Sequence, residues 1–147
     1  MARITSVVQE DVQYIAAEAD QILKQLSGTT LLVTGASGFL CSYFLDVVVA
    51  LNDRGLRPPC RVIALDNFVS GLPERINHLQ GRPDVQFICH DLKQAFEPNE
   101  PVHWIIHGAS IASPMVYRRF PLETIDVNVN GTRHMLELTH REVRSML

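Results

Sequence analysis

Residues 30–41 read Thr-Leu-Leu-Val-Thr-Gly-Ala-Ser-Gly-Phe-Leu-Cys, and this stretch decides the fold. The apolar run 30–34 is rich in strand formers, as is typical of a strand buried on both faces of a parallel sheet. Two glycines follow it, and a segment that fits a helix begins at Phe39. This order predicts a phosphate-binding turn: Gly35 permits the tight turn, and Gly38 lets the backbone approach a pyrophosphate. An ordinary strand-to-helix turn is the alternative.

Further apolar runs predict that strands and helices alternate along the chain. The other expected strands are 61–65, 85–89 and 102–106. Helices are expected at about 39–53, at 73–79 and at about 122–143, and a loop at 92–101. Such alternation implies right-handed crossovers. The sequence therefore predicts an α/β fold with a Rossmann-type, doubly wound parallel sheet of spatial order 3-2-1-4. The sheet is expected to be incomplete on its C-terminal side, with an open edge that favours homo-oligomers.

An additional amphipathic helix is predicted ahead of this sheet. Apolar residues recur at helical spacing from Val8 to Leu26, and Gly28 can end the helix. We expect its apolar stripe to pack against the main domain. The chain thus divides into an N-terminal helix, residues 1–28, and a nucleotide-binding domain, residues 29–147.

The composition is typical of a globular protein. Of 147 residues, 46% are hydrophobic and 20% are charged, which argues against disorder. The net charge of −3, with no basic block, argues against nucleic-acid binding. No apolar run reaches the ~18–20 residues of a membrane span. Glu10 and Asp11 interrupt the N-terminus too early for a signal peptide.

Cysteines and histidines give no metal or disulfide pattern. The three cysteines, Cys41, Cys60 and Cys89, are widely spaced and odd in number. A reducing, cytoplasmic setting is therefore expected. His103 and His107 would share one face of a strand, but the sequence offers no third ligand, so no metal site is expected.

Carboxylates at strand ends add candidate ligands for a dinucleotide. Asp66 ends the second strand, where a carboxylate accepts hydrogen bonds from adenosine ribose hydroxyls in this kind of fold. It would repel a 2′-phosphate, and no Arg or Lys lies in 67–71 to receive one, so NAD is expected rather than NADP. An exposed strand-end aspartate is the alternative. Asp91 can face the adenine after the third strand, although capping of its own loop explains it almost as well.

Small and polar residues follow the fourth strand. The segment His107-Gly-Ala-Ser110 would leave room for a dinucleotide across the strand ends. Within the last expected helix, Asn128 and the pair Gly131-Thr132 interrupt an apolar pattern, and a helical glycine costs about 1 kcal/mol relative to alanine. Contact with a ligand and close helix packing would each explain these residues.

Together these motifs resemble the extended short-chain dehydrogenase/reductases, in particular the NAD-dependent nucleotide-sugar epimerase/dehydratase family. The resemblance covers about 30–138 and leaves out the leading helix. It is carried by Thr34-Gly-x-x-Gly-Phe, Asp66-Asn67, Asp91-Leu92, His107-x-Ala-Ser110 and Asn128-Val-Asn-Gly-Thr132. The stretch Ala112-Ser-Pro114 with Tyr117 and Pro121 is most similar to UDP-glucuronate decarboxylases and dTDP-glucose 4,6-dehydratases.

The resemblance implies a cofactor, a chemistry and a set of cofactor-binding residues. In the family, NAD takes a hydride from the sugar C4 while a tyrosine removes the hydroxyl proton. The resulting keto sugar then epimerises, dehydrates or decarboxylates. The resemblance implies that the pyrophosphate would be surrounded by Gly35, Ser37, Gly38, Phe39 and Leu40, and that the adenosine ribose would be held by Asp66 and Asn67. It implies that the adenine pocket would be lined by Asp91 and Leu92. The nicotinamide side would be contacted by Ala109 and Ser110, with support from Asn128.

Two departures from the family pattern affect this expectation. Cys41 occupies the family's third glycine position, where it would push the helix outward and weaken dinucleotide binding. The catalytic Tyr-x-x-x-Lys is absent, since neither Lys24 nor Lys93 has a tyrosine four residues before it. The resemblance would place that pair, and the sugar-binding part, beyond Leu147.

Three hypotheses follow for the function. In the first, the chain is the NAD-binding portion of a nucleotide-sugar epimerase, dehydratase or decarboxylase, and binds NAD without turnover on its own. In the second, it is a non-catalytic dinucleotide sensor or assembly module. In the third, another chain completes it. None of them involves a membrane or a nucleic acid.

Overall fold

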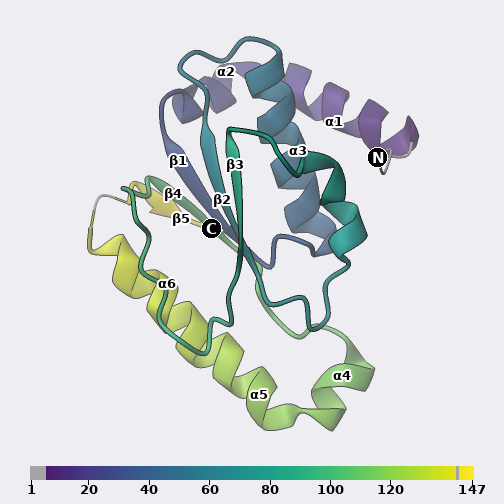
Figure 1. The fold of residues 1–147 in the computed structure, drawn as a ribbon, viewed down its shortest axis with the longest axis vertical. Coiled ribbons are helices and arrows are strands. Elements are labelled where there is room, and N and C mark those ends of the chain that lie inside the picture. Colours follow the sequence, from purple (N-terminus) through teal and green to yellow (C-terminus); the bar gives the residue numbers. More distant parts are fainter. Residues whose placement is uncertain (1–5, 142) are drawn as a thin grey trace.

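A parallel sheet runs through the middle of the computed structural model, which describes residues 6–141 and 143–147 (Figure 1). Within these residues the order is β3-β2-β1-β4-β5. The strands are β1 (Thr30–Thr34), β2 (Arg61–Asp66), β3 (Val85–Cys89), β4 (Trp104–His107) and β5 (Ser145–Met146). All neighbouring pairs are parallel. The predicted α/β class and the order 3-2-1-4 are confirmed.

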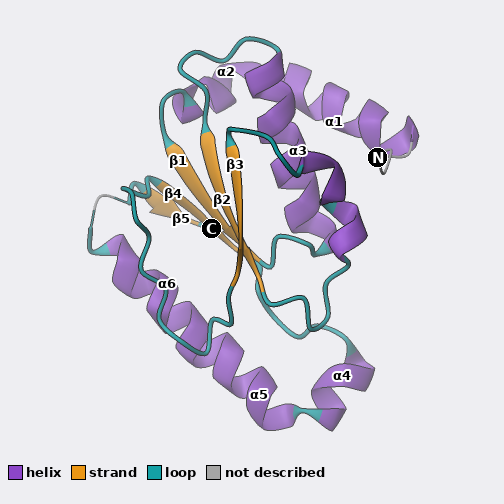
Figure 2. Ribbon diagram, viewed as in Figure 1, coloured by secondary structure: helices purple, strands orange, loops and turns teal. Residues whose placement is uncertain are grey.

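Helices cover both faces of the sheet, as Figure 2 shows. One face carries α3 (Phe39–Asp53), with α1 (Ser6–Glu18) beside it, and the other carries α6 (Thr132–Thr139), while α5 (Pro121–Asp126) extends beyond the ends of the strands. Side chains alternate accordingly along β1: Leu31 and Val33 join the core under α3, whereas Leu32 joins the core under α6. Because every strand residue of β1 is buried, its sequence is a continuous apolar run rather than an alternating one.

The leading segment packs on the outer side of α3. Val12 and Ala16 of α1 form a cluster there with Val47, Ala50 and Leu51. A helix that contacts the sheet on one side and another helix on the other is apolar almost all round, which explains the composition of α3.

The expected single leading helix is wrong in its length. After α1 the chain forms α2 (Asp20–Leu23) and a 3₁₀ turn (Lys24–Leu26). Ile15, part of the expected stripe, is 40% exposed, and the neighbouring Ala16 is buried in its place. The contact between α1 and α3 therefore uses the smaller side chain, which lets the two helices approach closely.

Two other expected helices also differ from the structure. Residues 73–79 form two 3₁₀ turns, Pro73–Arg75 and Asn77–Leu79, instead of one helix. The last helix is continuous from Pro121 to Thr139, through α5, a π turn over Val127–Gly131 and α6, and it ends before the expected residue 143. One further helix, α4 (Pro114–Arg119), was not expected from the sequence. Both α4 and α5 begin with proline, which suits the first position of a helix and prevents one continuous helix across Pro121.

The edge beside β4 is not fully open, contrary to expectation. The last residues form β5, in which Ser145 pairs with Trp104 and Met146 with Ile105. The Leu147 N–H donates to the Ile105 carbonyl at 2.9 Å. A strand of this length is too short to show a period, so the sequence pattern could not reveal it.

None of the helices in the described part of the chain combines the length and the apolar character that a membrane crossing requires.

Candidate functional site

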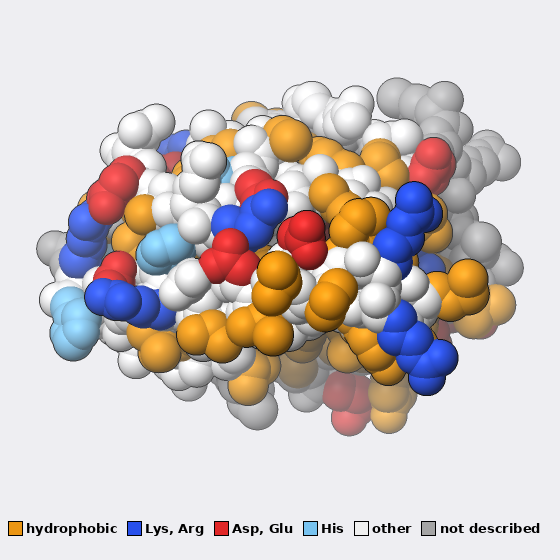
Figure 3. Space-filling model, turned by 90° about the horizontal axis from the view of Figure 1, so that it is seen from below, with side chains coloured by type: hydrophobic (Ala, Val, Ile, Leu, Met, Phe, Trp, Pro, Cys, Tyr) orange, Lys and Arg blue, Asp and Glu red, His pale blue; other side chains and the backbone are white. Residues whose placement is uncertain are grey.

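A cavity of about 770 Å³ opens at the carboxyl ends of β1, β2, β3 and β4. Its walls come from the segments that directly follow these strands, and from α3 and the α4–α5 region. Figure 3 looks onto this side of the molecule and shows hydrophobic side chains gathered there, with acidic and basic ones among them. The volume lies within the roughly 300–1,000 Å³ of small-molecule sites. Ligands of open α/β sheets bind at this edge, where the strand order reverses around β1.

The glycine turn between β1 and α3 lies against the segment after β4. Gly35 has φ +66°, and a Cβ there would lie 2.7 Å from the Gly108 carbonyl oxygen. A Cβ on Gly38 would lie 3.0 Å from the Gly35 oxygen. Gly38 is the N-cap of α3 and no side chain caps that helix. Phe39 and Leu40, in the first turn of α3, line the cavity. The N–H groups of a first turn have no partner within the helix and carry the positive end of the helix dipole.

Asp66 anchors the glycine turn to the end of β2. Its Oδ2 accepts hydrogen bonds from the Ser37 N–H (2.8 Å) and hydroxyl (2.7 Å), and its Oδ1 accepts from the Phe68 N–H (2.8 Å). The residue is 9% exposed and lines the cavity, so it is not an exposed strand-end aspartate. Gly71 closes over the pair, because a Cβ there would lie 1.8 Å from the Ser37 hydroxyl oxygen.

Asp91 caps its own loop and also lines the cavity. Its Oδ1 accepts from the Lys93 N–H at 3.0 Å, and its Oδ2 lies 3.3 Å from the Lys93 Nζ. The loop-capping contact is therefore observed, and a role beside the adenine stays a prediction. Lys93 lines the cavity too, so a cation comes from the loop after β3 although 67–71 contains none. Leu92 is buried beside the π turn, 3.3 Å from the position of a Cβ on Gly131.

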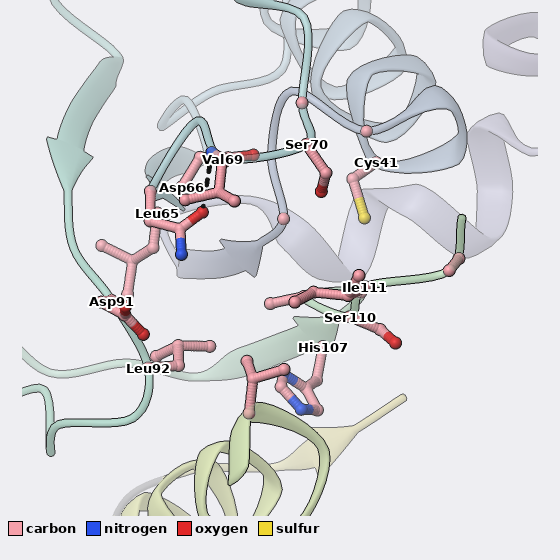
Figure 4. Close-up of a pocket in the computed structure, with 18 of the residues that line it drawn as sticks. Cys41, Leu65, Asp66, Val69, Ser70, Asp91, Leu92, His107, Ser110 and Ile111 are labelled. Carbon is pink, nitrogen blue, oxygen red and sulfur yellow. Dashed lines mark hydrogen bonds between the residues drawn. The ribbon is translucent and has the colours of Figure 1, made fainter. Parts of the chain in front are cut away.

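The segment after β4 closes the floor of the cavity. The Ala109 N–H donates to the Thr34 hydroxyl at 3.2 Å, and Ser110 is exposed. His107 lies between Thr34, at 2.7 Å from its Nδ1, and Thr132, at 3.1 Å from its Nε2. Figure 4 shows its ring below Ser110 and beside the helix that follows α5. Burial lowers the pKa of His107, which favours the neutral imidazole.

Cys41 points into the same region from the first turn of α3 (Figure 4). The side chain is 6% exposed, and its Sγ lies 3.5 Å from the Thr34 carbonyl oxygen. A Cβ on Gly108 would lie 2.3 Å from that sulfur. Burial, and secondarily the charge of Asp66, raises the pKa of the Cys41 thiol. The sulfur is therefore protonated at neutral pH and fills space that a side chain at 108 would need.

Most of the residues expected to hold a dinucleotide line this one cavity. They are Gly35, Gly38, Phe39, Leu40, Asp66, Asn67, Asp91, Leu92, Ala109 and Ser110. Ser37 is buried behind them, where it bonds Asp66. Asn128 is exposed and lies outside the lining residues, and its carbonyl accepts the Thr132 hydroxyl proton at 2.6 Å.

Several apolar and aromatic residues of the cavity lining were not expected from the sequence. Examples are Phe44, Val69, Ile111 and Phe120. Val69 and Phe120 are 64% and 40% exposed, and each stands in a loop or at a helix boundary rather than in an apolar run. An isolated apolar residue in a polar loop near a strand end is the sequence feature that could have indicated them.

No three His, Cys, Asp or Glu side chains within residues 6–141 and 143–147 are grouped so that they could hold a metal ion. Tyr117 lies in α4 and is not among the residues that line the cavity.

Comparison with known proteins gives consistent matches. A model of the NAD dependent epimerase/dehydratase family matches residues 31–146. UDP-glucuronic acid decarboxylase 1 of Arabidopsis thaliana is 36% identical over 111 residues, which are 76% of this chain and 23% of the relative. The chain thus spans about a quarter of that relative's length.

Solved structures agree with this match. A dTDP-glucose 4,6-dehydratase from Streptomyces venezuelae, solved with NAD bound, superposes with a TM-score of 0.65 at 25% identity, over 75% of this chain and 35% of its own. The UDP-glucose 4-epimerase of Thermus thermophilus, in complex with NAD, gives a TM-score of 0.53 at 26% identity, over 75% of this chain and 33% of its own.

Proposed function

This chain belongs to the NAD dependent epimerase/dehydratase family, and we propose that it is the NAD-binding portion of an enzyme that oxidises a nucleotide sugar at C4. The observation that carries the proposal is the glycine turn: its Gly35 and Gly38 leave no side chain between the cavity and the uncapped start of α3. An uncapped helix start with bare backbone is suited to a pyrophosphate.

The remaining lining residues fit the other parts of the dinucleotide. Asp66 would accept hydrogen bonds from the adenosine ribose while it holds Ser37, because a carboxylate has about four lone-pair sites and three are used. Asn67 lies beside it, and Asp91 with Leu92 would border the adenine. The small segment Ala109–Ser110 leaves room for the nicotinamide end at the strand ends of β1 and β4.

NAD supplies the acceptor for a hydride from the sugar, and the side chains of this chain bind and orient it. A proton must also leave the sugar hydroxyl, which needs a base within hydrogen-bond reach. Tyr117 lies outside the cavity lining, and neither lysine is four residues after a tyrosine. We therefore propose that these 147 residues bind NAD without turnover, and that the base and the sugar site belong to a longer chain or a partner chain.

The substrate class, the setting and the assembly are also proposals. The matched relative is a UDP-glucuronic acid decarboxylase, which supports a nucleotide sugar as substrate. The cysteines are free, which supports a reducing, cytoplasmic setting. The exposed apolar side chains of Met115, Leu122, Ile125 and Val129, between 60% and 84% exposed, support a homo-oligomer.

The proposal is tested by titrating NAD(H) and NADP(H) against the chain in a calorimeter. We expect saturable binding of NAD(H) and weaker binding of NADP(H), because a 2′-phosphate would meet the Asp66 carboxylate. The same protein is then assayed by NADH absorbance with UDP-glucuronate and with dTDP-glucose, and no turnover is expected. Equal or tighter NADP(H) binding would refute the cofactor choice. Turnover would refute the proposal that the base lies elsewhere.

A further inference from the structure

His107 bridges three separate elements at the floor of the cavity. It ends β4, its Nδ1 lies 2.7 Å from the Thr34 hydroxyl oxygen at the end of β1, and its Nε2 lies 3.1 Å from the Thr132 hydroxyl oxygen at the start of α6. The ring is partly buried and lines the cavity. The imidazole therefore links Thr34 to Thr132.

Neighbouring hydrogen bonds determine which atom is the donor and which the acceptor in the contacts of His107 with Thr34 and Thr132. The Thr34 oxygen already accepts the Ala109 N–H at 3.2 Å, so its own proton is available for His107 Nδ1. The Thr132 hydroxyl donates to the Asn128 carbonyl at 2.6 Å, so its oxygen accepts from His107 Nε2–H. Every donor has an acceptor only when His107 is neutral and carries its proton on Nε2.

The series of hydrogen bonds from Thr34 through His107 to Thr132 ends, on each side, at a segment of the cavity wall. At one end is the backbone of Ala109, which follows Gly108, the glycine that packs against Gly35 and Cys41. At the other end is the π turn, whose Gly131 packs on Leu92. Single π turns inside α-helices are frequent at functional sites. These hydrogen bonds thus connect the segment after β4 to the part of the cavity wall beside which the adenine would lie.

We infer that His107 is a positioning residue: its neutral imidazole, held between Thr34 and Thr132, fixes the Ala109 backbone at the place where the nicotinamide end of NAD would lie. The inference rests on the proposed function, because it assumes that NAD occupies this cavity. His107 acts through Thr34 and does not serve as an acid or a base.

Three variants separate the two hydrogen bonds. In His107→Asn the amide oxygen can accept from Thr34 at the Nδ1 position, but the side chain does not reach Thr132. In His107→Gln the amide can donate to Thr132, but Thr34 loses its acceptor. His107→Phe loses both. The matched control is His103→Asn, because the His103 Nδ1 accepts the Thr30 N–H at 3.0 Å and the residue does not line the cavity.

NAD dissociation constants are measured for each variant, together with thermal unfolding. His107→Phe and His107→Gln are expected to bind NAD roughly three- to tenfold more weakly, which corresponds to about one lost hydrogen bond. His107→Asn is expected to recover most of the affinity, and His103→Asn to leave it unchanged. A purely structural role predicts instead that affinity follows thermal stability across all variants.

Nitrogen NMR of the ¹⁵N-histidine-labelled wild type gives a second result that needs no variant. We expect His107 to show a protonated Nε2 and an unprotonated Nδ1 at neutral pH. The opposite tautomer overturns the inference, as does a His107→Phe variant that folds and binds NAD as tightly as the wild type. A wild type that binds no NAD overturns the proposed function together with this inference, so the two failures are distinguishable.

Discussion

Cys41 and Gly108 form a complementary pair, because a Cβ on Gly108 would lie 2.3 Å from the Cys41 sulfur. The cysteine that stands at the family's third glycine position is thus accommodated by a missing side chain on the facing segment. The sulfur occupies the space that a side chain at position 108, directly after β4, would otherwise fill. The Gly108 carbonyl oxygen lies 2.7 Å from where a Cβ on Gly35 would be, so the turn and the β4 exit are packed backbone to backbone.

The first prediction concerns this pair. Gly108→Ala is expected to lower the free energy of unfolding by about 1–3 kcal/mol, as overpacking does. In a Cys41→Gly background the same change should cost less, with a coupling of roughly 0.5–3 kcal/mol between the two sites. Urea unfolding of the four proteins of this cycle measures the coupling. Cys60→Ala is the control, since Cys60 is buried in the core cluster but is not among the atoms nearest to Gly108. Additive effects of Cys41→Gly and Gly108→Ala would contradict the pairing.

The second prediction concerns Asp66. Asp66→Ala removes the acceptor of three hydrogen bonds at once. Hydrogen bonds to charged groups contribute about 1.5–3 kcal/mol each, so the variant should lose stability as well as NAD affinity. Ser37→Ala removes only the hydroxyl bond and should lose less stability. Asp91→Asn serves as the control for the stability measurement alone, because its pair with Lys93 is solvent-exposed and such pairs contribute about 0–1 kcal/mol. An Asp66→Ala protein with wild-type stability would show that the carboxylate does not anchor the turn.

The third prediction concerns the thiols. Burial raises the pKa of Cys60 to about 11, and burial with the charge of Asp66 raises the pKa of Cys41. Cys89 is exposed. Since the thiolate is the reactive form, iodoacetamide should modify Cys89 first in the native protein. Mass spectrometry of peptides from briefly treated protein measures the order, and Cys89→Ser should leave almost no rapid reaction. Rapid modification of Cys41 would contradict the packing described above.

The fourth prediction concerns pH. Burial lowers the pKa of His107 below its ordinary value of 6.5. Below about pH 6.5, His107 binds a proton in the unfolded protein but stays neutral in the folded protein. The free energy of unfolding should therefore fall as the pH drops from about 6.5 toward the lowered pKa. His107→Gln should remove this part of the slope, at most about 1.4 kcal/mol per pH unit. The comparison isolates His107 from the partly buried pair of Asp46 and His78, which is present in both proteins. Parallel stability curves for the two proteins would contradict the assignment.

The sheet and the glycine turn were predictable because their signals are local. A continuous apolar run, two glycines and a helical segment follow one another within 30–53. They indicate a dinucleotide-binding fold, whose usual strand order begins 3-2-1-4. The carboxylate of Asp66 was placed correctly at the end of β2 for the same reason.

The connections across the cavity were not predictable from the sequence. Thr34 and His107 are 73 residues apart, and His107 and Thr132 are 25 apart, so their contact depends on strand register and helix position. The bond between Ser37 and Asp66 likewise joins the glycine turn to the end of β2, which are 29 positions apart in the sequence. The motif places Asn128 at the cofactor, whereas in the structure it is exposed and lies outside the cavity lining.

NMR mapping of NAD on the ¹⁵N-labelled chain tests the central claim most directly. We predict that the amide resonances of Gly38, Phe39 and Leu40, of Asn67, and of Ala109 and Ser110 shift on titration with NAD, while those of α1 do not. The Asp66→Asn protein should show smaller shifts at the same NAD concentration. Shifts confined to residues outside the cavity, or no shifts at any residue, would contradict the claim that the carboxyl ends of β1, β2 and β4 form an NAD site.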